Sequence, residues 1–433
     1  MDNLAGKKLL ILGGTSASFD VVEQAVGMGI FVIVADDKAE DIGIAKTIAD
    51  KAVQISTTDH QALVRYIEEN NVDGIFCGPG EFNIQNCLTV AEMAGLPFYC
   101  TQEQWSICTN KAIFKAYCQK HDIPTVPEFN VSREQLEKAS YNFEYPLVIK
   151  PVDSAGSRGL TVCEGREMVL PAYELALRHS RSKNILFEKY IDNGGLVFSF
   201  RYILDNGKYY PYLTFDTYVV DPVNKEYLIS AFTYFPSRFT DSFLSNLDKK
   251  IQLMFADMGL TFGTAFVQAF PYKGSILCNE MGLRLSGGVM HKFTEPLMGI
   301  NDTKMMIRYA LGGPMIKEDE LARIVLNRND IVMAQLMIPL NCGIVGSVTG
   351  LEEIRQNMNV LDFIQYYNPG DTVREEVMGT LGQHFGRFTL QAKNKEEMIS
   401  LVRFIQDKLL IKDLDGADMN TMKFDLERLR EIS

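Results

Sequence analysis

Short apolar runs alternate with segments of helical spacing along the first hundred or so residues, and this alternation constrains the fold more than any other feature. The run "KKLLILGG" is continuously apolar and ends at glycines, as a buried parallel strand does. Similar runs occur at "IFVIVADD" and "VDGIFCG", and amphipathic stretches such as "SFDVVEQAVGMG" separate them. This repetition predicts a parallel sheet with helices on both faces.

A dinucleotide-binding site in this segment is not favoured. Asp36 lies about 20 residues beyond Gly14, where a ribose-binding acid would lie, but "GGTSAS" lacks the third glycine of that fingerprint. We therefore expect a tight strand-to-helix turn in a scaffold or substrate-side domain. Glu81, in "CGPGEF", follows a strand at the same sheet edge as Gly13. It could contact a substrate, or it could be a solvated loop acid.

Length and composition limit the classes of function. A chain of 433 residues exceeds one small core and predicts two or three domains. The net charge of -12 argues against general nucleic-acid binding, and no apolar run approaches the roughly 20 residues of a membrane helix. The start does not resemble a signal peptide, and the 8 cysteines form no CxxC or Cys/His cluster. We therefore expect a cytoplasmic protein with reduced cysteines.

The pattern changes after Trp105. "NKAIFKAYCQKHDIP" is an amphipathic helix, and "FSFRYILDNGKYYPYLTF" predicts an antiparallel hairpin that turns at residues 205–207. From about Ile331 a last segment mixes strands with helices. The charged tail "DMNTMKFDLERLREIS" predicts a surface helix.

Two lysines stand where anions could bind. Lys150 ends an apolar strand and precedes a Gly/Ser loop at 153–160, whose backbone N–H groups could close over phosphate oxygens. The alternative is a surface turn whose lysine reaches water. Lys111 lies near a helix start, where its charge opposes the macrodipole and a phosphate partner would help. The alternative is an ordinary exposed lysine.

Two acids and an arginine complete the set. Glu188 ends the strand in "LFEKYI", and an edge strand there offers main-chain groups that suit adenine, although a plain surface acid is the alternative. In "CNEMGLRLSGG", period-2 alternation puts residues 278, 280, 282 and 284 on one face, with open space at Gly282. Glu280 could hold Mg²⁺, and Arg284 suits a phosphate or carboxylate. The alternative is an ion pair between them that braces the strand.

In their order and composition these four elements resemble the ATP-grasp superfamily, of the carboxylate–amine ligase type. The resemblance runs from about residue 1 to 430, and its architecture is similar to that of L-amino-acid ligases and biotin carboxylase. It implies an α/β fold with a pre-ATP-grasp parallel (Rossmann-like) domain at 1–104, then a two-lobed α+β ATP-grasp domain at 105–330 with a mobile lid lobe at about 145–200. A C-terminal α+β ligase subdomain at 331–433 would follow.

The resemblance also assigns roles to individual residues. The motif positions that bind ATP in the family correspond to Lys111, Lys150, Ser154, Gly156, Ser157, Gly159, Glu188, Lys189, Tyr190 and Ile191. The metal positions correspond to Glu280 and to Gln268, where the family has a second carboxylate, and the catalytic arginine to Arg284. Two further departures are Gly282 in place of the usual asparagine and an apolar stretch at 196–198, where a polar residue would contact ribose.

The resemblance implies an enzyme that uses ATP and Mg²⁺ to join a carboxylate to an amine through an acyl phosphate, releasing ADP and phosphate. Its substrates would be small molecules, amino acids among them, and a homodimer is compatible with the family. Two alternatives stay open. One is a bicarbonate-activating enzyme like carbamoyl-phosphate synthetase or biotin carboxylase. The other is a catalytically inactive nucleotide-binding scaffold, with which Gln268 and the apolar ribose position are compatible.

Overall fold

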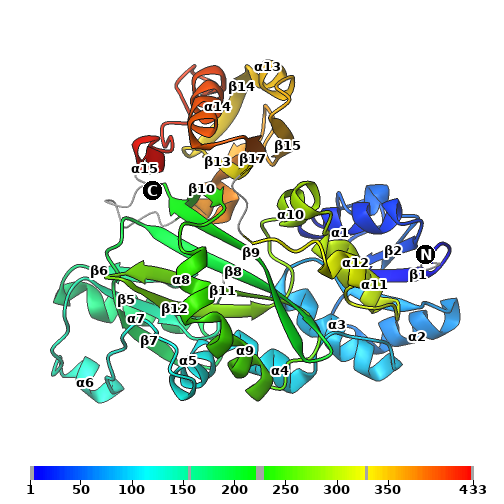
Figure 1. The fold of residues 1–433 in the computed structure, drawn as a ribbon, viewed down its shortest axis with the longest axis horizontal. Coiled ribbons are helices and arrows are strands. Elements are labelled where there is room, and N and C mark those ends of the chain that lie inside the picture. The colour runs from blue at the N-terminus through cyan, green and yellow to red at the C-terminus, as the bar shows by residue number, and fades with distance from the viewer. Residues whose placement is uncertain (1–3, 155–157, 221–228, 327–329, 431–433) are drawn as a thin grey trace.

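The computed structural model describes residues 4–154, 158–220, 229–326 and 330–430 (Figure 1). Its N-terminal part is a four-stranded parallel sheet in the order β3-β2-β1-β4. The strands are β1 (Lys8–Leu12), β2 (Phe31–Asp36), β3 (Lys51–Gln54) and β4 (Gly74–Cys77). Between them lie α1 (Ser16–Gly27), η1 (Lys46–Ile48) and α2 (His60–Asn70), and α3 (Glu81–Ala94) follows β4. The predicted parallel sheet is therefore confirmed, with β3 as an additional short strand.

The turn after β1 is closed by side chains of its own segment. Asp36 Oδ2 accepts a hydrogen bond from the Gly14 N–H at 2.9 Å, and Asp36 Oδ1 pairs with Lys46 Nζ at 2.5 Å. A Cβ atom on Gly14 would lie 2.4 Å from Asp36 Oδ2. Asp36 therefore fills this turn, which agrees with the tight-turn interpretation.

Helices from much later in the chain also cover the parallel sheet. These are α10 (His291–Met298), α11 (Asp302–Ala310) and α12 (Glu318–Leu321), which lie beside α1 in Figure 1. Gly74 approaches α11 so closely that a Cβ atom would lie 2.3 Å from the Ala310 carbonyl oxygen, and Lys7 Nζ donates to the Leu311 carbonyl at 2.8 Å. Helices from residues 291–321 therefore pack against the N-terminal sheet.

An eight-stranded antiparallel sheet forms the centre of the molecule, in the order β12-β11-β8-β9-β10-β13-β17-β15. Its strands are β8 (Leu196–Asp205), β9 (Lys208–Val219), β10 (Ser230–Phe235), β11 (Gly263–Tyr272), β12 (Ser275–Leu283), β13 (Val332–Pro339), β15 (Val360–Gln365) and β17 (His384–Ala392). The predicted hairpin is β8–β9, which turns at Asn206 and Gly207, both with positive φ. The strands after residue 331 extend the same sheet.

One face of this sheet packs against α8 (Thr240–Asn246) and α9 (Asp248–Asp257) (Figure 1). Phe200 stacks on Phe243 with ring centroids 4.4 Å apart, and Tyr202 meets Phe255 edge-on at 5.3 Å. Because side chains alternate along a strand, the residues between these aromatics point to the opposite face. That opposite face carries the candidate site.

A small lobe with its own core lies beside the central sheet. Its three strands, in the order β6-β5-β7, are β5 (Leu147–Pro151), β6 (Thr161–Cys163) and β7 (Ile185–Lys189). The accompanying helices are α6 (Arg133–Glu137), η2 (Arg166–Met168) and α7 (Val169–His179), and α4 (Gln102–Thr109) and α5 (Lys111–Lys120) precede the lobe. Its core includes Leu147, Ile149, Ala176 and Phe187, apart from the two larger cores.

The last segment adds a three-stranded sheet of β14 (Gly343–Thr349), β16 (Thr372–Val373) and β18 (Leu410–Asp413), with α13 (Leu351–Arg355), η3 (Glu375–Val377), η4 (Leu381–Gln383) and α14 (Lys395–Lys408). The predicted tail helix is wrong for most of its length, since α15 covers only Glu427–Arg430. Phe424 is buried and stacks on Phe232 at 4.6 Å, so packing holds the chain in a non-helical path. Among the described residues, no helix is both long and apolar enough to cross a membrane.

Candidate active site

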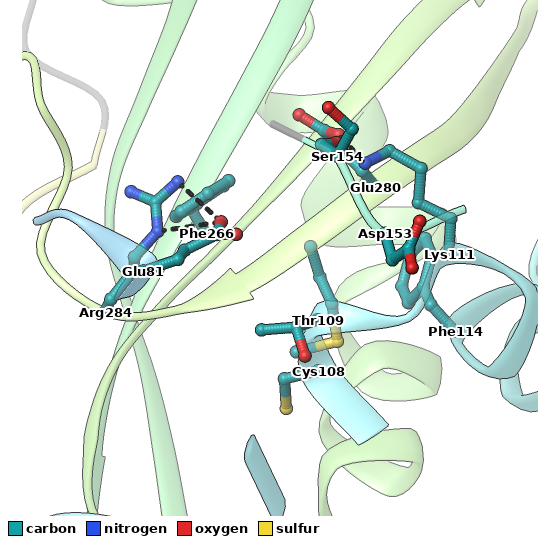
Figure 2. A pocket seen from close by; sticks show the side chains of 11 residues that line it. Glu81, Cys108, Thr109, Lys111, Phe114, Asp153, Ser154, Phe266, Glu280 and Arg284 are labelled. Atoms are coloured by element: carbon teal, nitrogen blue, oxygen red, sulfur yellow. Dashed lines mark hydrogen bonds and ion pairs between the residues drawn. The ribbon is translucent and has the colours of Figure 1, made fainter. Parts of the chain in front are cut away.

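A narrow cavity of about 60 Å³ opens between the N-terminal domain, the small lobe and the central sheet. Its walls are formed by Glu81, Cys108, Thr109, Lys111, Phe114, Asp153, Ser154, Phe266, Glu280, Met281 and Arg284 (Figure 2). Four residues named from the sequence as ATP-binding, metal-binding or catalytic, Lys111, Ser154, Glu280 and Arg284, therefore meet in one cavity.

Lys111 is held at the first position of α5. Asn110 caps this helix, because its side chain accepts hydrogen bonds from the N–H groups of Ala112 and Ile113. Lys111 Nζ donates to the Ser154 carbonyl at 2.9 Å and pairs with Glu280 Oε2 at 3.1 Å. Although burial alone would lower it, Glu280 holds the pKa of Lys111 above its ordinary value. Lys111 therefore keeps its charge and joins the Gly/Ser loop to the predicted metal acid.

Lys150 lies in a second charged cluster, next to the first. Its Nζ pairs with Glu188 Oε2 at 2.6 Å and donates to Asn279 Oδ1 at 2.8 Å. Glu188 is only 2% exposed and also pairs with Lys115. Although burial alone would raise it, Lys150 and Lys115 hold the pKa of Glu188 below its ordinary value. The alternative interpretations, Lys150 as a lysine of a surface turn and Glu188 as a plain surface acid, are thus excluded.

Sequence reasoning missed Lys115. It is buried, pairs with Glu128 at 2.5 Å and donates to the Val126 carbonyl at 3.1 Å, in addition to its contact with Glu188. Its position four residues after Lys111 could have indicated that both lysines face the same site, since residues i and i+4 share one face of a helix.

The edge of β7 is less open than expected. The Phe129 N–H donates to the Phe187 carbonyl at 2.8 Å, and the Lys189 N–H donates to the Pro127 carbonyl at 3.0 Å. The Tyr190 N–H donates to the Pro146 carbonyl at 3.2 Å, and Lys189 Nζ pairs with Glu144 at 2.9 Å. If residues 188–191 contact the adenine, the main chain around Ile191 is the part left to do so. Adenine binding by this segment stays a prediction.

Gln268 and Glu280 are direct cross-strand neighbours in β11 and β12. The register shifts beside them, because Ala269 pairs with Cys278 and leaves Asn279 as an additional residue. Such a bulge breaks the period of two, so the expectation that residue 278 shares a face with residue 280 is wrong. Cys278 is fully buried, and the amide of Asn279 turns toward Lys150.

Arg284 finds its carboxylate partner in the N-terminal domain. Its Nε and Nη2 lie 3.4 and 3.3 Å from Glu81 Oε1 at the start of α3, and its Nη1 donates to the Leu285 carbonyl at 3.0 Å (Figure 2). Its guanidinium lies over the Phe266 ring, 5.0 Å from the centroid. The alternative interpretation, an ion pair between Glu280 and Arg284, is therefore wrong. Arg284 pairs instead with Glu81 of the N-terminal segment.

The space beside Gly282 is filled. A Cβ atom there would lie 2.5 Å from the ring of Phe266. The expectation of open space at Gly282 is therefore wrong, and the glycine accommodates an aromatic ring. The asparagine that the family usually has at this position would not fit without displacing Phe266.

The Gly/Ser loop is anchored at both of its described ends. Asp153 accepts hydrogen bonds from Ser180 Oγ at 2.8 Å and from the Ser182 N–H at 2.7 Å. Gly159 has a φ of +75°, and a Cβ atom there would lie 2.8 Å from Cβ of His179. Gly156 and Ser157, both predicted to bind phosphate, lie outside the described residues.

A magnesium ion would find few protein ligands here. Within the described ranges, no group of three or more His, Cys, Asp or Glu side chains is placed to hold a metal. The donors are the Glu280 carboxylate, which is 30% exposed, and the neighbouring Gln268 amide. Mg²⁺ is commonly bound by one or two carboxylates together with substrate phosphates and water. The pair therefore fits an ion that arrives with a nucleotide.

Residues 110–195 match the model of the carbamoyl-phosphate synthase L chain, ATP binding domain, a range that includes Lys111, Lys150 and Glu188. The formate-dependent phosphoribosylglycinamide formyltransferase of Sulfurisphaera tokodaii is 25% identical over 75% of this chain and 82% of its own length. The chain spans only about half the length of other curated relatives of that name.

Many solved structures are similar to this chain, among them an L-amino acid ligase and a biotin carboxylase. The L-amino acid ligase from Bacillus licheniformis superposes with a TM-score of 0.76 and 20% identity, covering 94% of this chain and 99% of that one. Biotin carboxylase from Campylobacter jejuni superposes with a TM-score of 0.72 and 18% identity, covering 100% and 96%. The chain has the ATP-grasp fold, so the predicted resemblance and fold class are confirmed. The relatives also confirm the prediction of an enzyme of the ATP-dependent ligase type.

Proposed function

We propose that this chain is an ATP-dependent carboxylate–amine ligase that forms an amide or peptide bond through an acyl phosphate. The observation that carries the proposal is the convergence on one cavity of Lys111, at the start of α5, with Glu280 and Arg284, at the end of β12. Mg²⁺ and ATP would be its cofactors, and small acids and amines, amino acids among them, its substrates. We also propose the division into 1–104, 105–330 and 331–433, a lid lobe at about 145–200, and a homodimer as the form to test.

The chain's own residues are suited to positioning and charge neutralisation, which dominate phosphoryl transfer. Lys111 and Lys150 would exchange their carboxylate partners for phosphate oxygens, while the loop at 153–160 closes over them. Glu280 and Gln268 would hold Mg²⁺, whose charge would offset that of the phosphates. Arg284, fixed by Phe266 and Glu81, would hold the transferring phosphoryl group and the acyl phosphate. The closed loop would keep water from the acyl phosphate until an amine attacks.

The proposal is tested by ADP release from MgATP with a panel of amino acids, offered singly and in pairs, and with bicarbonate. Release that requires both an acid and an amine supports the ligase. Release with bicarbonate alone would favour the bicarbonate-activating alternative. Nucleotide binding without release under any condition would point to the inactive scaffold.

Lys150→Ala should weaken ATP binding by about tenfold or more in the folded protein, because a hydrogen bond to a charged group contributes about 1.5–3 kcal/mol. Nucleotide titration of the purified variant, with circular dichroism to verify folding, measures the effect. Lys138→Ala, at an exposed lysine of the same lobe, is the control and should bind as the parent does. Unchanged affinity in Lys150→Ala would remove this strand and loop from the phosphate site.

Gln268→Glu should lower the Mg²⁺ concentration needed for half-maximal activity, because a hard cation prefers carboxylate oxygens. Without metal, the new carboxylate opposes Glu280 across the two strands, so the melting temperature should fall. MgATP should restore it. A metal requirement identical to that of the parent would show that Gln268 does not face the metal.

A further inference from the structure

Two buried arginines lie beneath the loop that follows Arg284. Arg201 is on β8 and is 5% exposed, and Arg387 is on β17 and is 8% exposed. Three strands separate them in the order of the central sheet, yet both reach the same loop at residues 286–288.

The contacts of these arginines are with neutral groups. Arg201 Nη2 donates to Ser286 Oγ at 3.0 Å, and Arg387 Nη1 donates to the Gly287 carbonyl at 3.1 Å. A third side chain, Gln335 on β13, donates to the Gly288 carbonyl at 2.8 Å. The buried Nε of Arg201 and that of Arg387 have no hydrogen-bond partner in the part of the chain that the structure describes.

Aromatic rings and distant acids compensate these charges only in part. The Arg201 guanidinium lies 5.1 Å from the ring centroid of Phe215 and 5.2 Å from that of Phe266. Asp302 acts on Arg201 from beyond ion-pair distance, and its Oδ2 already accepts from Tyr212 at 2.8 Å. Burial raises the pKa of Asp20, the acid near Arg387, to about 7, so it carries only part of a charge at neutral pH.

In the part of the chain that the structure describes, neither Arg201 nor Arg387 forms an ion pair with a carboxylate within 4.0 Å. A buried charge without an ion-pair partner is strongly unfavourable, and an incoming anion would relieve it. Two guanidinium groups present planar forks of donors, the arrangement that matches a carboxylate.

The loop above the arginines is open to solvent. Gly287 is exposed, and a Cβ atom there would meet nothing within 4 Å. Phe266 contacts both Arg201 and Arg284 and lines the cavity, so Arg201 adjoins the Arg284 end, and Arg387 reaches the same loop through the Gly287 carbonyl. Figure 2 shows Lys111 and Glu280 at the other end of the same cavity.

We propose that Arg201 and Arg387 bind the carboxylate of the amine substrate, which makes the acceptor an amino acid or another amine that bears a carboxylate. This inference rests on the proposed ligase function. The acid to be activated must lie near the phosphates, between Lys111, Glu280 and Arg284. The amine therefore approaches from the far side of Arg284, where the two unpaired guanidiniums lie.

The test compares amino acids with their primary amides as ligands of the same protein. Binding is measured by thermal shift and titration calorimetry, without nucleotide and with the non-hydrolysable analogue MgAMPPNP. We expect at least one amino acid to bind the parent at least tenfold more tightly than its amide. Arg387→Gln and Arg201→Gln should each lose about 10- to 100-fold in affinity for that amino acid and keep their affinity for the amide.

Gln335→Met is the matched control, because it removes a neutral donor to the same loop and leaves the charge in place. It should retain the preference for the amino acid. If it loses as much as the arginine variants, the arginines only position the loop and the inference is overturned. Arg387→Lys, which keeps the charge without the fork, should lose part of the affinity and serves where the glutamine variants do not fold.

Equal binding of amino acids and amides by the parent would overturn the inference without any variant. Binding of inorganic phosphate in their place, lost in both arginine variants, would also overturn it, because the site would then be a phosphate site. ADP release can also be compared with amide forms of each substrate. If replacing a carboxylate by an amide matters only on the activated acid and not on the amine, the assignment of the arginines to the amine is overturned. MgATP titration of the same samples tests the ligase proposal separately, so failure of one is distinguishable from failure of the other.

Discussion

Arg284→Lys is expected to lower turnover by about 10²-fold or more, the scale observed when one preorganised donor is removed, with ATP affinity within a few-fold of the parent. The guanidinium lies at the end of the cavity opposite Lys111, where it would meet the transferring group and not the base or ribose. A contact that strengthens in the transition state lowers the barrier without tightening the ground state equally. Lysine keeps the charge but loses the fork, so the substitution tests geometry.

Turnover, nucleotide affinity and melting temperature should be measured on the same purified variant. Glu81→Gln is its matched control, because it removes the carboxylate partner of Arg284 and keeps the arginine side chain itself. If Arg284 served only to join the two domains, both variants would be destabilised to a similar extent and would stay active. A destabilised but fully active Arg284→Lys protein would therefore contradict a catalytic role.

Glu188→Gln is expected to cost about 3–5 kcal/mol of folding free energy, because it leaves Lys115 and Lys150 buried without their shared carboxylate. Urea unfolding at neutral pH measures the loss. Glu128→Gln is the control, since Glu128 also pairs with Lys115 but is 34% exposed, and it should cost under about 1 kcal/mol. Equal losses in the two variants would show that the Lys150–Glu188 pair contributes little.

The Glu188 effect should also depend on pH. Because the folded-state pKa of Glu188 is depressed, its stabilisation is fully present above the unfolded-state value near 4.3 and is lost as the pH falls through the folded-state value. The difference in unfolding free energy between parent and Glu188→Gln should therefore be constant from about pH 6 upward and shrink below about pH 4. A difference that grows on acidification would contradict this account.

The sequence predicted what depends on local periodicity and residue chemistry. Alternation gave the parallel sheet, and "DNG" gave the β8–β9 hairpin. The residue types at Lys111, Glu280 and Arg284 pointed to an anion and metal site, and the structure brings these side chains to one cavity. The failures arose where long-range contacts override the period. The bulge at Asn279 shifted the face of β12, and burial of Phe424 kept most of the tail out of a helix.

Other parts of the site could not be foreseen, because their partners are distant in the sequence. Nothing near Arg387 indicates that it meets the loop after Arg284, since β17 reaches that loop only through the eight-stranded sheet. Arg201 lies in an apolar strand, where a single arginine carries little local signal. Lys115 was within reach of helix-face reasoning, but its acids, Glu128 and Glu188, lie on other elements.

The most direct test of the central claim follows oxygen from the acid to the phosphate. The acid–amine pair with the fastest ADP release is used, with the acid labelled with ¹⁸O in its carboxylate, and the released phosphate is analysed by mass spectrometry. Attack of the carboxylate on the γ-phosphate followed by attack of the amine on the acyl carbon transfers one carboxylate oxygen to phosphate. The account predicts one ¹⁸O atom in each phosphate released with product. Unlabelled phosphate formed together with the amide would contradict an acyl-phosphate intermediate.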